Sequence, residues 1–132
     1  MTADAGQRPA QTLSKERLRL WLKLLKASGM IEEEVRRRLC RDFDWPLPRF
    51  DVMSALHRHP DGLKMSEISR LLRVSNGNIT GIVDKLTDEG LALRVSVAGD
   101  RRANLIRLTP KGRALFADHA AVHEGWIDEL LG

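Results

Sequence analysis

The sequence predicts a mainly α-helical protein with one small β-hairpin, and three observations lead to this fold class. Apolar residues recur at helical spacing over most of the chain. Two short amphipathic segments, 66–72 and 75–90, follow each other closely, as in a helix-turn-helix. In the next segment, 91–108, apolar residues alternate on both sides of a turn that contains Gly99 and three charged residues, which predicts a hairpin.

The composition fits a single intracellular domain. The chain has 132 residues, of which 42% are hydrophobic and 30% charged. It contains no apolar run of the roughly 18 residues that a membrane span requires, and its N-terminus lacks the basic start and apolar block of a signal peptide. Cys40 is the single cysteine, so no internal disulfide can form. We therefore expect a cytoplasmic protein with no membrane association and no cofactor.

The N-terminal part is predicted to be a tail followed by a long helix. Residues 1–12 show no apolar period, which predicts a mobile tail, and residues 13–132 are predicted to form one domain. The first helix, within 13–43, begins near Ser14 and carries apolar residues on two faces. Such a helix is expected to pack on its own core and on a partner subunit. The Pro-containing segment 44–48 ends it.

The middle and C-terminal elements are delimited by caps and turns. A short helix is predicted from Arg49 to about His57. Ser66 and Ser75 are the predicted N-caps of the two helices of the helix-turn-helix, the second of which ends at Gly90. Thr109 is expected to cap the last helix, with proline at its first position. The helix-turn-helix and hairpin would then occupy 49–109, between helical segments 13–43 and 110–132.

The net charge is concentrated in the middle of the chain. Between Asp61 and Arg113 there are ten basic and six acidic residues, a net charge of +4 that equals the net charge of the whole chain. A localised positive excess attracts nucleic acid or an anionic surface, although a plain solvated surface has the same appearance.

The helix after Ser75 has an unusual outer face. Ile79, Ile82, Val83 and Leu86 are predicted to point inward, and the outer face then includes two glycines. Each glycine lowers helix stability by roughly 1 kcal/mol relative to alanine, which favours a surface that another molecule approaches closely. A DNA major groove admits one helix, and asparagine, serine and threonine bond bases or phosphates. The alternative is a plain amphipathic helix with a polar surface.

The hairpin supports the DNA interpretation. Arg101 and Arg102 lie at its predicted tip beside Asp100. Arginine side chains at such a tip can enter a narrow minor groove, and an acidic neighbour can orient them.

These features occur together in a known family. The chain resembles the MarR family of winged helix-turn-helix transcription regulators from about Leu13 to Leu131. The resemblance rests on the run Met65-Ser66-Glu67-Ile68-Ser69-Arg70-Leu71-Leu72-Arg73-Val74-Ser75-Asn76-Gly77-Asn78-Ile79-Thr80-Gly81-Ile82-Val83-Asp84-Lys85-Leu86, on Glu89-Gly90-Leu91, on Asp100-Arg101-Arg102 and on Leu108-Thr109-Pro110-Lys111-Gly112.

The resemblance implies a homodimer that reads a pseudopalindromic double-stranded operator. It implies N- and C-terminal dimerisation helices, a recognition helix, and a wing that an ion pair of Asp100 orients. Family members usually continue past the position of Leu131 into a further helix, so either the chain is truncated after Gly132 or the dimer relies on 13–40 and 110–131. The DNA-binding residues expected from motif and resemblance are Ser66, Ser75, Asn76, Asn78, Thr80, Lys85, Asp100, Arg101 and Arg102.

MarR-type regulators generally release DNA when a small ligand binds, which implies a ligand-responsive regulator, here a repressor. Segments such as Leu47-Pro48-Arg49-Phe50-Asp51 are similar to those of family members that control aromatic-acid catabolism. The expected ligand is therefore an aromatic acid or its coenzyme A thioester. Candidate pocket residues, which could equally be core, are Trp21, Phe43, Trp45, Phe50, Met53, His57 and Trp126.

Other functions remain open at this stage. His119 and His123 are four residues apart on the last helix, a spacing that can offer two imidazoles to zinc in a zinc-responsive regulator. A winged helix can also serve protein contact alone. An enzyme is not expected, because the chain has no nucleophile–base pattern and no phosphate-binding glycine loop.

Overall fold

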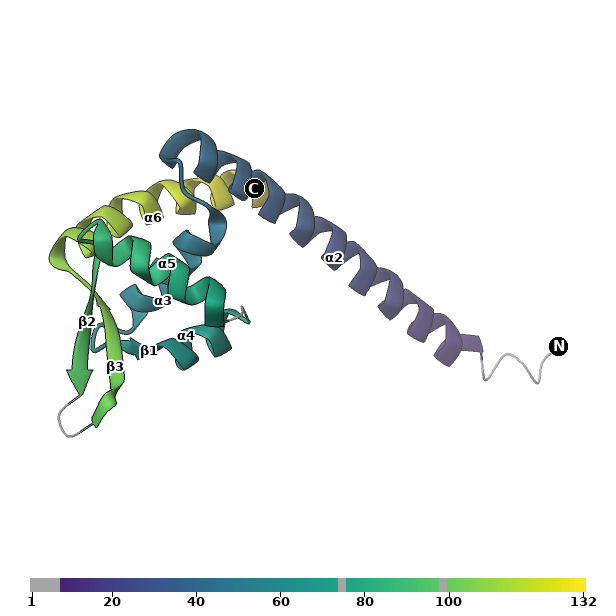
Figure 1. Cartoon of the computed structure of the whole chain (residues 1–132). Coiled ribbons are helices and arrows are strands. Elements are labelled where there is room, and N and C mark those ends of the chain that lie inside the picture. Colours follow the sequence, from purple (N-terminus) through teal and green to yellow (C-terminus); the bar gives the residue numbers. More distant parts are fainter. Residues whose placement is uncertain (1–7, 74–75, 98–99) are drawn as a thin grey trace. The chain divides into compact units, whose positions relative to one another are not determined.

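The computed structural model describes residues 8–73, 76–97 and 100–132. These residues form five helices and three strands, which Figure 1 shows in their order along the chain. The bounds are α2 Arg8–Phe43, α3 Leu47–Arg58, β1 Leu63–Lys64, α4 Met65–Leu72, α5 Asn76–Asp88, β2 Ala92–Val97, β3 Asp100–Leu108 and α6 Pro110–Leu131. The predicted fold class, helical with a small sheet, is confirmed.

The chain divides into two compact units, Met1–Val35 and Arg36–Gly132. Helix α2 runs from the first unit into the second, and every later element belongs to the second. The helix-turn-helix, the hairpin and the C-terminal helix are therefore parts of one unit.

Helix α2 begins earlier than the sequence predicts. Residues 8–12 are helical, so the predicted mobile tail is wrong for them, and residues 1–7 lie outside the described part of the chain. Pro9 does not interrupt the helix, because proline is tolerated in the first turn, where its missing N–H has no intrahelical acceptor. The helix ends at Phe43, and Asp44 then takes a positive φ of 55°.

Helix α3 also begins earlier than expected, at Leu47 instead of Arg49. Pro46 is its N-cap residue in an extended conformation, with φ −63° and ψ 145°. Pro48 lies within the first turn, where the loss of an N–H costs no hydrogen bond. The prolines that end α2 thus also start α3.

The core of the second unit is formed by side chains from all of its longer elements. The largest side chains with less than 2% exposure are Leu39, Val52, Met53, Leu56, Ile68, Ile79, Val83, Leu86 and Ile106. They come from the last turns of α2, from α3, α4 and α5, and from β3. Burial of such side chains is the main stabilising contribution to the fold.

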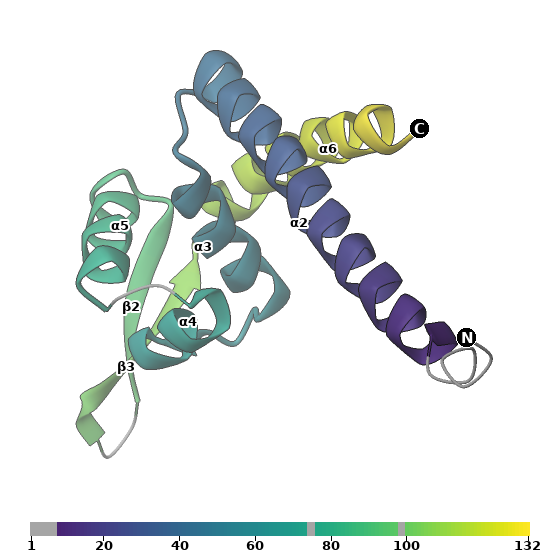
Figure 2. The same cartoon turned by 90° about the vertical axis from the view of Figure 1, so that its right-hand side faces the viewer.

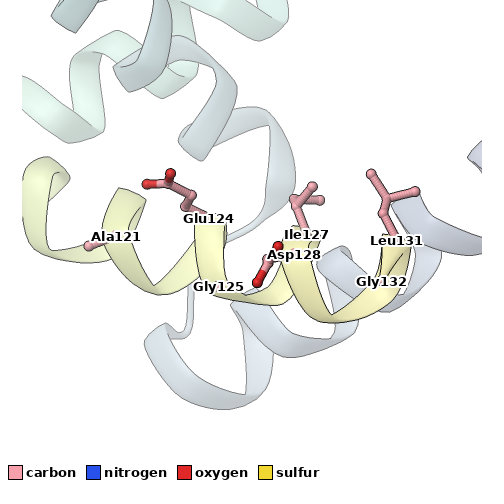
Figure 3. A pocket seen from close by; sticks show the side chains of 7 residues that line it. All are labelled: Ala121, Glu124, Gly125, Ile127, Asp128, Leu131 and Gly132. Carbon is pink, nitrogen blue, oxygen red and sulfur yellow. The ribbon is translucent and has the colours of Figure 1, made fainter.

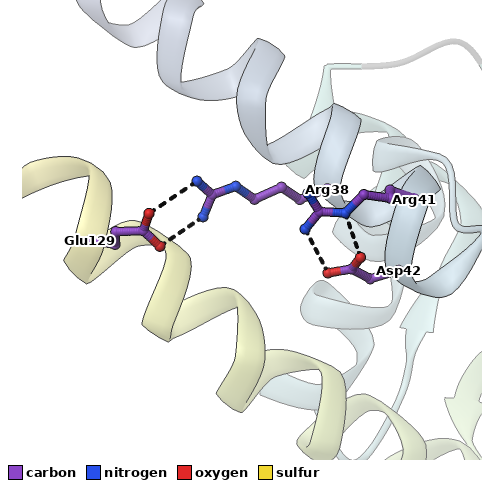
Figure 4. A network of polar contacts seen from close by, with 4 residues as sticks. All are labelled: Arg38, Arg41, Asp42 and Glu129. Atoms are coloured by element: carbon purple, nitrogen blue, oxygen red, sulfur yellow. Dashed lines mark hydrogen bonds and ion pairs between the residues drawn. The ribbon is translucent and has the colours of Figure 1, made fainter.

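The last turns of α2 are also joined to α6 by an ion pair. The guanidinium of Arg38 donates to both carboxylate oxygens of Glu129, at 3.0 and 3.3 Å (Figure 4). In the same region Arg41 donates to its neighbour Asp42 at 2.6 and 3.0 Å. The bidentate geometry of Arg38 and Glu129 fixes two elements that are 91 residues apart in the sequence.

The sheet has three antiparallel strands in the order β1-β3-β2. The hairpin β2–β3 is the predicted one, but β3 begins at Asp100 where a turn was expected up to Ala103. Strand β1 pairs with Leu105 and Ile106 of β3 and was not predicted. Two residues are too short to show an alternating pattern, so only the pairing reveals this strand. In both views, one end of the paired strands β2 and β3 projects past α3, α4 and α5 (Figures 1 and 2).

The helix-turn-helix is confirmed, with one corrected cap. Helix α4 begins at Met65, so Ser66 lies inside the helix and the N-cap is Lys64, whose backbone N–H donates to the Glu67 carboxylate at 3.0 Å. Lys64 leaves β1 in an extended conformation, which places it directly before the helix. The predicted cap of the second helix, Ser75, lies outside the described residues.

Helix α6 starts at the predicted cap. The Thr109 hydroxyl accepts from the Gly112 backbone N–H at 3.0 Å and donates to the Gly90 carbonyl at 2.7 Å. The Thr109 backbone N–H donates to the Leu91 carbonyl at 3.0 Å. A Cβ atom on Gly112 would lie 2.0 Å from that carbonyl oxygen. Only glycine therefore allows the helix to start this close to the segment that follows α5.

Candidate nucleic-acid interface

The outer face of α5 is the part of the molecule best suited to reach a nucleic acid. Ile79, Val83 and Leu86 have no exposed surface and anchor the helix to the core, as predicted, whereas Ile82 is only half-buried. The outer face is exposed at Gly77, Asn78, Thr80, Gly81, Asp84 and Lys85. It carries amide, hydroxyl and ammonium groups, which can donate hydrogen bonds to base edges and phosphates.

Both glycines of this face are open to the surroundings. A Cβ atom on Gly77 or Gly81 would meet no heavy atom within 4 Å. Packing within the chain therefore does not require glycine at either position. Because these two residues have no side chain, the backbone of α5 is accessible on the same face as Asn78 and Thr80.

The predicted DNA-binding residues divide into those that the structure describes and those that it does not. Ser66, Asn78, Thr80 and Lys85 are exposed, the first on α4 and the other three on α5. Ser75 lies outside the described residues. The backbone of four others belongs to α5 or β3, but their side chains are outside the description; these are Asn76, Asp100, Arg101 and Arg102. The ion pair that orients the wing stays a prediction.

An ion pair that the sequence analysis missed joins the hairpin to α5. The Arg94 guanidinium, on β2, donates to the carboxylate of Asp84, on the outer face of α5. Both side chains are partly exposed, at 43% and 56%, so the pair contributes little free energy. Its effect is geometric, because it connects the base of the hairpin to the exposed face of the helix.

A second missed contact lies at the C-terminal end of α5. Arg49, in the first turn of α3, donates to the Glu89 carboxylate at 2.5 Å, and its guanidinium carbon lies 4.7 Å from the centre of the Trp45 ring. The Arg49 hydrogen bond holds the pKa of Glu89 below its ordinary value, so the carboxylate stays charged. Arg49 is 10% exposed, and its Nε atom is buried without a hydrogen-bond partner among the described residues.

A small crevice opens between the start of α3 and α5. Its volume is about 190 Å³, and it is lined by Pro46, Pro48, Arg49, Asn78, Ile82 and Lys85. The lining is largely apolar but includes two cationic side chains and an amide. The crevice shares Asn78 and Lys85 with the exposed face of α5.

The predicted ligand-pocket residues are mostly core. Trp45, Phe50, Met53 and Trp126 are between 0 and 8% exposed. Phe43 is half-buried and stacks on Trp126 at a centroid distance of 5.6 Å. The remaining two, Trp21 on α2 and His57 on α3, are exposed. The aromatic side chains pack against one another, which favours the core interpretation that the sequence left open.

The two histidines of α6 belong to the same aromatic cluster. The His119 ring stacks on Phe43 at 3.8 Å and lies edge-on to Trp45 at 4.2 Å, and the His123 ring lies 4.6 Å from Phe50. Within residues 8–73, 76–97 and 100–132, no group of three potential metal ligands comes together. No observation of the structure therefore favours the zinc alternative.

Burial of His119 and His123 should make the free energy of unfolding depend on pH. Burial lowers the pKa of both histidines from the ordinary 6.5; at His119, Asp118 opposes and Arg49 adds to this shift. As the pH falls through 6.5 towards the lower pKa values of the folded state, the unfolded chain binds protons that the folded chain does not. The free energy of unfolding should therefore decrease over this window. Denaturant titrations at several pH values measure it, and a His119→Gln/His123→Gln variant should show a flatter profile; an unchanged slope in that variant would contradict the assignment.

Comparison with known proteins agrees with this geometry. A sequence profile of the MarR family matches residues 43–103. The regulator MhqR of Bacillus subtilis is 27% identical over 119 residues, which cover 90% of this chain and 81% of MhqR. A MarR family transcriptional regulator of known structure from Silicibacter pomeroyi is 32% identical with a TM-score of 0.70, covering 89% of this chain and 80% of that protein.

A further structure shows the same fold on DNA. Sco3205 of Streptomyces coelicolor, solved in complex with DNA, is 21% identical with a TM-score of 0.75, covering 87% of this chain and 72% of its own. None of the described helices of this chain has both the length and the hydropathy of a membrane span. The relatives are transcription regulators and not enzymes, and DNA binding by the family argues against a winged helix used for protein contact alone. With its helix-turn-helix, its hairpin and a relative that is 32% identical over 80% of its own length, the chain belongs to the MarR family of DNA-binding transcriptional regulators.

Proposed function

We propose that this protein is a homodimeric, ligand-responsive repressor that acts in the cytoplasm on a pseudopalindromic operator. The observation that carries the proposal is the outer face of α5, where Asn78, Thr80 and Lys85 are exposed around two bare glycines. Such a face can enter a major groove, which is about 12 Å wide and admits a single helix. We further propose that the hairpin β2–β3 reaches the neighbouring minor groove through Arg101 and Arg102.

Positive charge supports contact with the phosphate backbone. Among the basic residues of the segment 61–113, those with exposed side chains are Lys64, Arg70, Arg73, Lys85, Arg94 and Lys111. A protein that neutralises several phosphates binds DNA with an affinity that falls steeply with salt concentration. The proposal therefore includes a salt-dependent, sequence-independent component of binding.

Two substitutions on α5 separate base reading from phosphate contact. Asn78→Ala should weaken binding to the preferred duplex by about 1–3 kcal/mol and relax the preference at particular base pairs, because it removes a bond to a base edge. Lys85→Ala should weaken binding to all duplexes alike and reduce the salt slope by about one unit. Fluorescence anisotropy at a series of salt concentrations measures both effects. Wild-type affinity and preference in both variants would refute the docking of α5.

Unpartnered apolar surface supports the homodimer. Eight large apolar side chains of α2 are between 45 and 65% exposed; these are Leu13, Leu18, Leu20, Trp21, Leu22, Leu24, Leu25 and Met30. Monomeric proteins rarely leave such a continuous apolar surface in water. At the end of α6, Ile127 and Leu131 point to the same side, over an open groove of about 780 Å³ that also includes Glu124, Gly125 and Asp128 (Figure 3). A second copy of the chain would cover surfaces of this kind on both helices.

We place the effector in the crevice between α3 and α5. A small aromatic carboxylate there would find apolar walls and the cations of Arg49 and Lys85, and it would cover Asn78. The volume of about 190 Å³ is below the roughly 300–1,000 Å³ of drug-sized pockets. This size favours a single-ring acid over its coenzyme A thioester. Binding there competes with DNA for the same side chains, which accounts for release.

Footprinting on the DNA that adjoins the coding region tests the proposed function. A two-fold symmetric protected region with two chains per duplex is the expected result, and single-ring aromatic carboxylates should abolish the protection. Protection of a single half-site by one chain would refute the homodimer. Protection that no acid of the panel reverses would refute the effector class.

A further inference from the structure

Arg49 links three elements around the end of the recognition helix. It lies in the first turn of α3, donates to Glu89 at 2.5 Å and places its guanidinium over the Trp45 ring at 4.7 Å. Glu89 directly follows α5, and its backbone N–H continues the helix by donating to the Lys85 carbonyl at 3.1 Å. Through this chain of contacts, α3 and the segment before it are fixed to the C-terminal end of α5.

The environment of Arg49 makes this link rigid. The side chain is 10% exposed, and the Trp45 ring that it covers is buried. Trp45 in turn packs edge-on against His119 of α6 at a centroid distance of 4.2 Å. A planar guanidinium that stacks on an indole and donates to a carboxylate has few alternative orientations. Arg49 also lines the crevice beside Asn78 and Lys85, directly behind the exposed face of α5.

We propose that Arg49 is a positioning residue for DNA recognition, which acts through Glu89 to set the orientation of α5 relative to α3. The core contacts of Ile79, Val83 and Leu86 hold α5 against the unit by apolar packing, which is not directional. The hydrogen-bonded ion pair adds a directional contact at the helix end. A small rotation of α5 would displace Asn78 and Lys85 from the base edges and phosphates that they meet.

The contact is better suited to orientation than to stability. Arg49 is 10% exposed and Glu89 is 39% exposed, so the attraction between them is screened on the Glu89 side and offset by the hydration that Arg49 loses, and the net contribution of the pair to the free energy of unfolding is small. Bonds to base edges, in contrast, depend on donor–acceptor distances and angles. Substitution of Glu89 alone leaves the buried Arg49 charge without its partner and lowers the free energy of unfolding, so DNA binding is compared between samples of equal folded fraction.

The test uses the full chain and a duplex that the wild-type protein selects from a randomised pool, with a scrambled duplex of equal composition as reference. Glu89→Gln removes the ion pair and one negative charge. Simple electrostatics predicts tighter binding of this variant to both duplexes. If Arg49 positions α5, the variant should instead bind the selected duplex roughly tenfold more weakly while its affinity for the scrambled duplex is unchanged or higher.

Asp88→Asn is the matched control, because it makes the same change of charge at the exposed neighbouring residue, for which no ion pair occurs among the described residues. It should leave the ratio of the two affinities at the wild-type value. Arg49→Lys keeps the charge of the pair but not the planar stacking on Trp45, and it should reduce the ratio less than Glu89→Gln does. Unfolding free energies of all variants show whether the folded fraction is constant.

The outcomes separate this inference from the function on which it rests, which is base reading by α5. If Glu89→Gln has the same affinity ratio as Asp88→Asn, or loses affinity for both duplexes by the same factor, Arg49 has no positioning role. If the wild-type protein itself shows no preference for any selected duplex, the proposed function fails instead. If Glu89→Gln does not fold, the affinity ratio of Arg49→Lys decides: a value equal to the wild-type ratio overturns the proposal.

Discussion

Among alanine substitutions at the glycines that the structure describes, Gly112→Ala should lower the free energy of unfolding most. A Cβ atom there would lie 2.0 Å from the carbonyl oxygen of Leu91 and 2.9 Å from its carbonyl carbon. The obstacle is backbone, which cannot rotate away as a side chain can. Moreover, the same carbonyl accepts the backbone N–H of Thr109 at 3.0 Å, so the loop cannot shift without losing the contact that starts α6.

We expect Gly112→Ala to lower the free energy of unfolding by about 3 kcal/mol, at the upper end of the usual cost of overpacking. Urea titration followed by circular dichroism measures it. Gly125→Ala is the control in the same helix: its Cβ would meet nothing within 4 Å, so it should raise the free energy of unfolding by up to about 1 kcal/mol. Equal stability of the two variants would mean that α6 does not start against Leu91 as described.

The double variant Gly77→Ala/Gly81→Ala should change the free energy of unfolding and the affinity for DNA in opposite directions. Both positions have open space around the missing Cβ, so the double variant should gain about 1 kcal/mol in the free energy of unfolding at Gly81, inside α5, and less at Gly77, in its first turn. If the bare face approaches DNA closely, the two methyl groups hold the helix away from the groove. We expect the affinity for the preferred duplex to fall at least tenfold, an effect of opposite sign to that on stability.

Thermal unfolding and anisotropy titrations on the same samples measure the two effects. Lower stability of the double variant would show that the glycines are needed for the fold. Higher stability with unchanged affinity would show that α5 does not approach DNA closely at these positions.

Most elements of the fold could be predicted because their signals are local. Thr109 and Pro110 mark the start of α6 through cap chemistry, and the inward row of α5 follows from helical spacing. The wrong cap has a cause that is not local, because the strand before it exists only through pairing with β3. The cap assigned to Ser66 belongs to Lys64, because the strand β1 runs directly into α4, and a strand of two residues leaves no pattern to detect.

The candidate site was only partly predictable for a different reason. Asn78, Thr80 and Lys85 could be assigned to an exposed face from the helical wheel alone. The contacts that hold this face in place could not. Arg49 and Glu89 are 40 residues apart, and a sequence offers many acidic partners for each arginine. The crevice between α3 and α5 likewise depends on how two helices pack.

By itself, the sequence determined the order of the helices and of the hairpin, the polar and glycine-containing face of α5 and the family to which the chain belongs. These properties depend on residue type and on spacing along the chain, which determine helix, hairpin and cap directly. The tertiary structure decided which aromatic residues are core, where Arg94 and Arg49 contact α5 and the residue after it, and that Gly112 must be glycine. Those properties depend on distances between segments that are remote in sequence, and only the packed chain sets such distances.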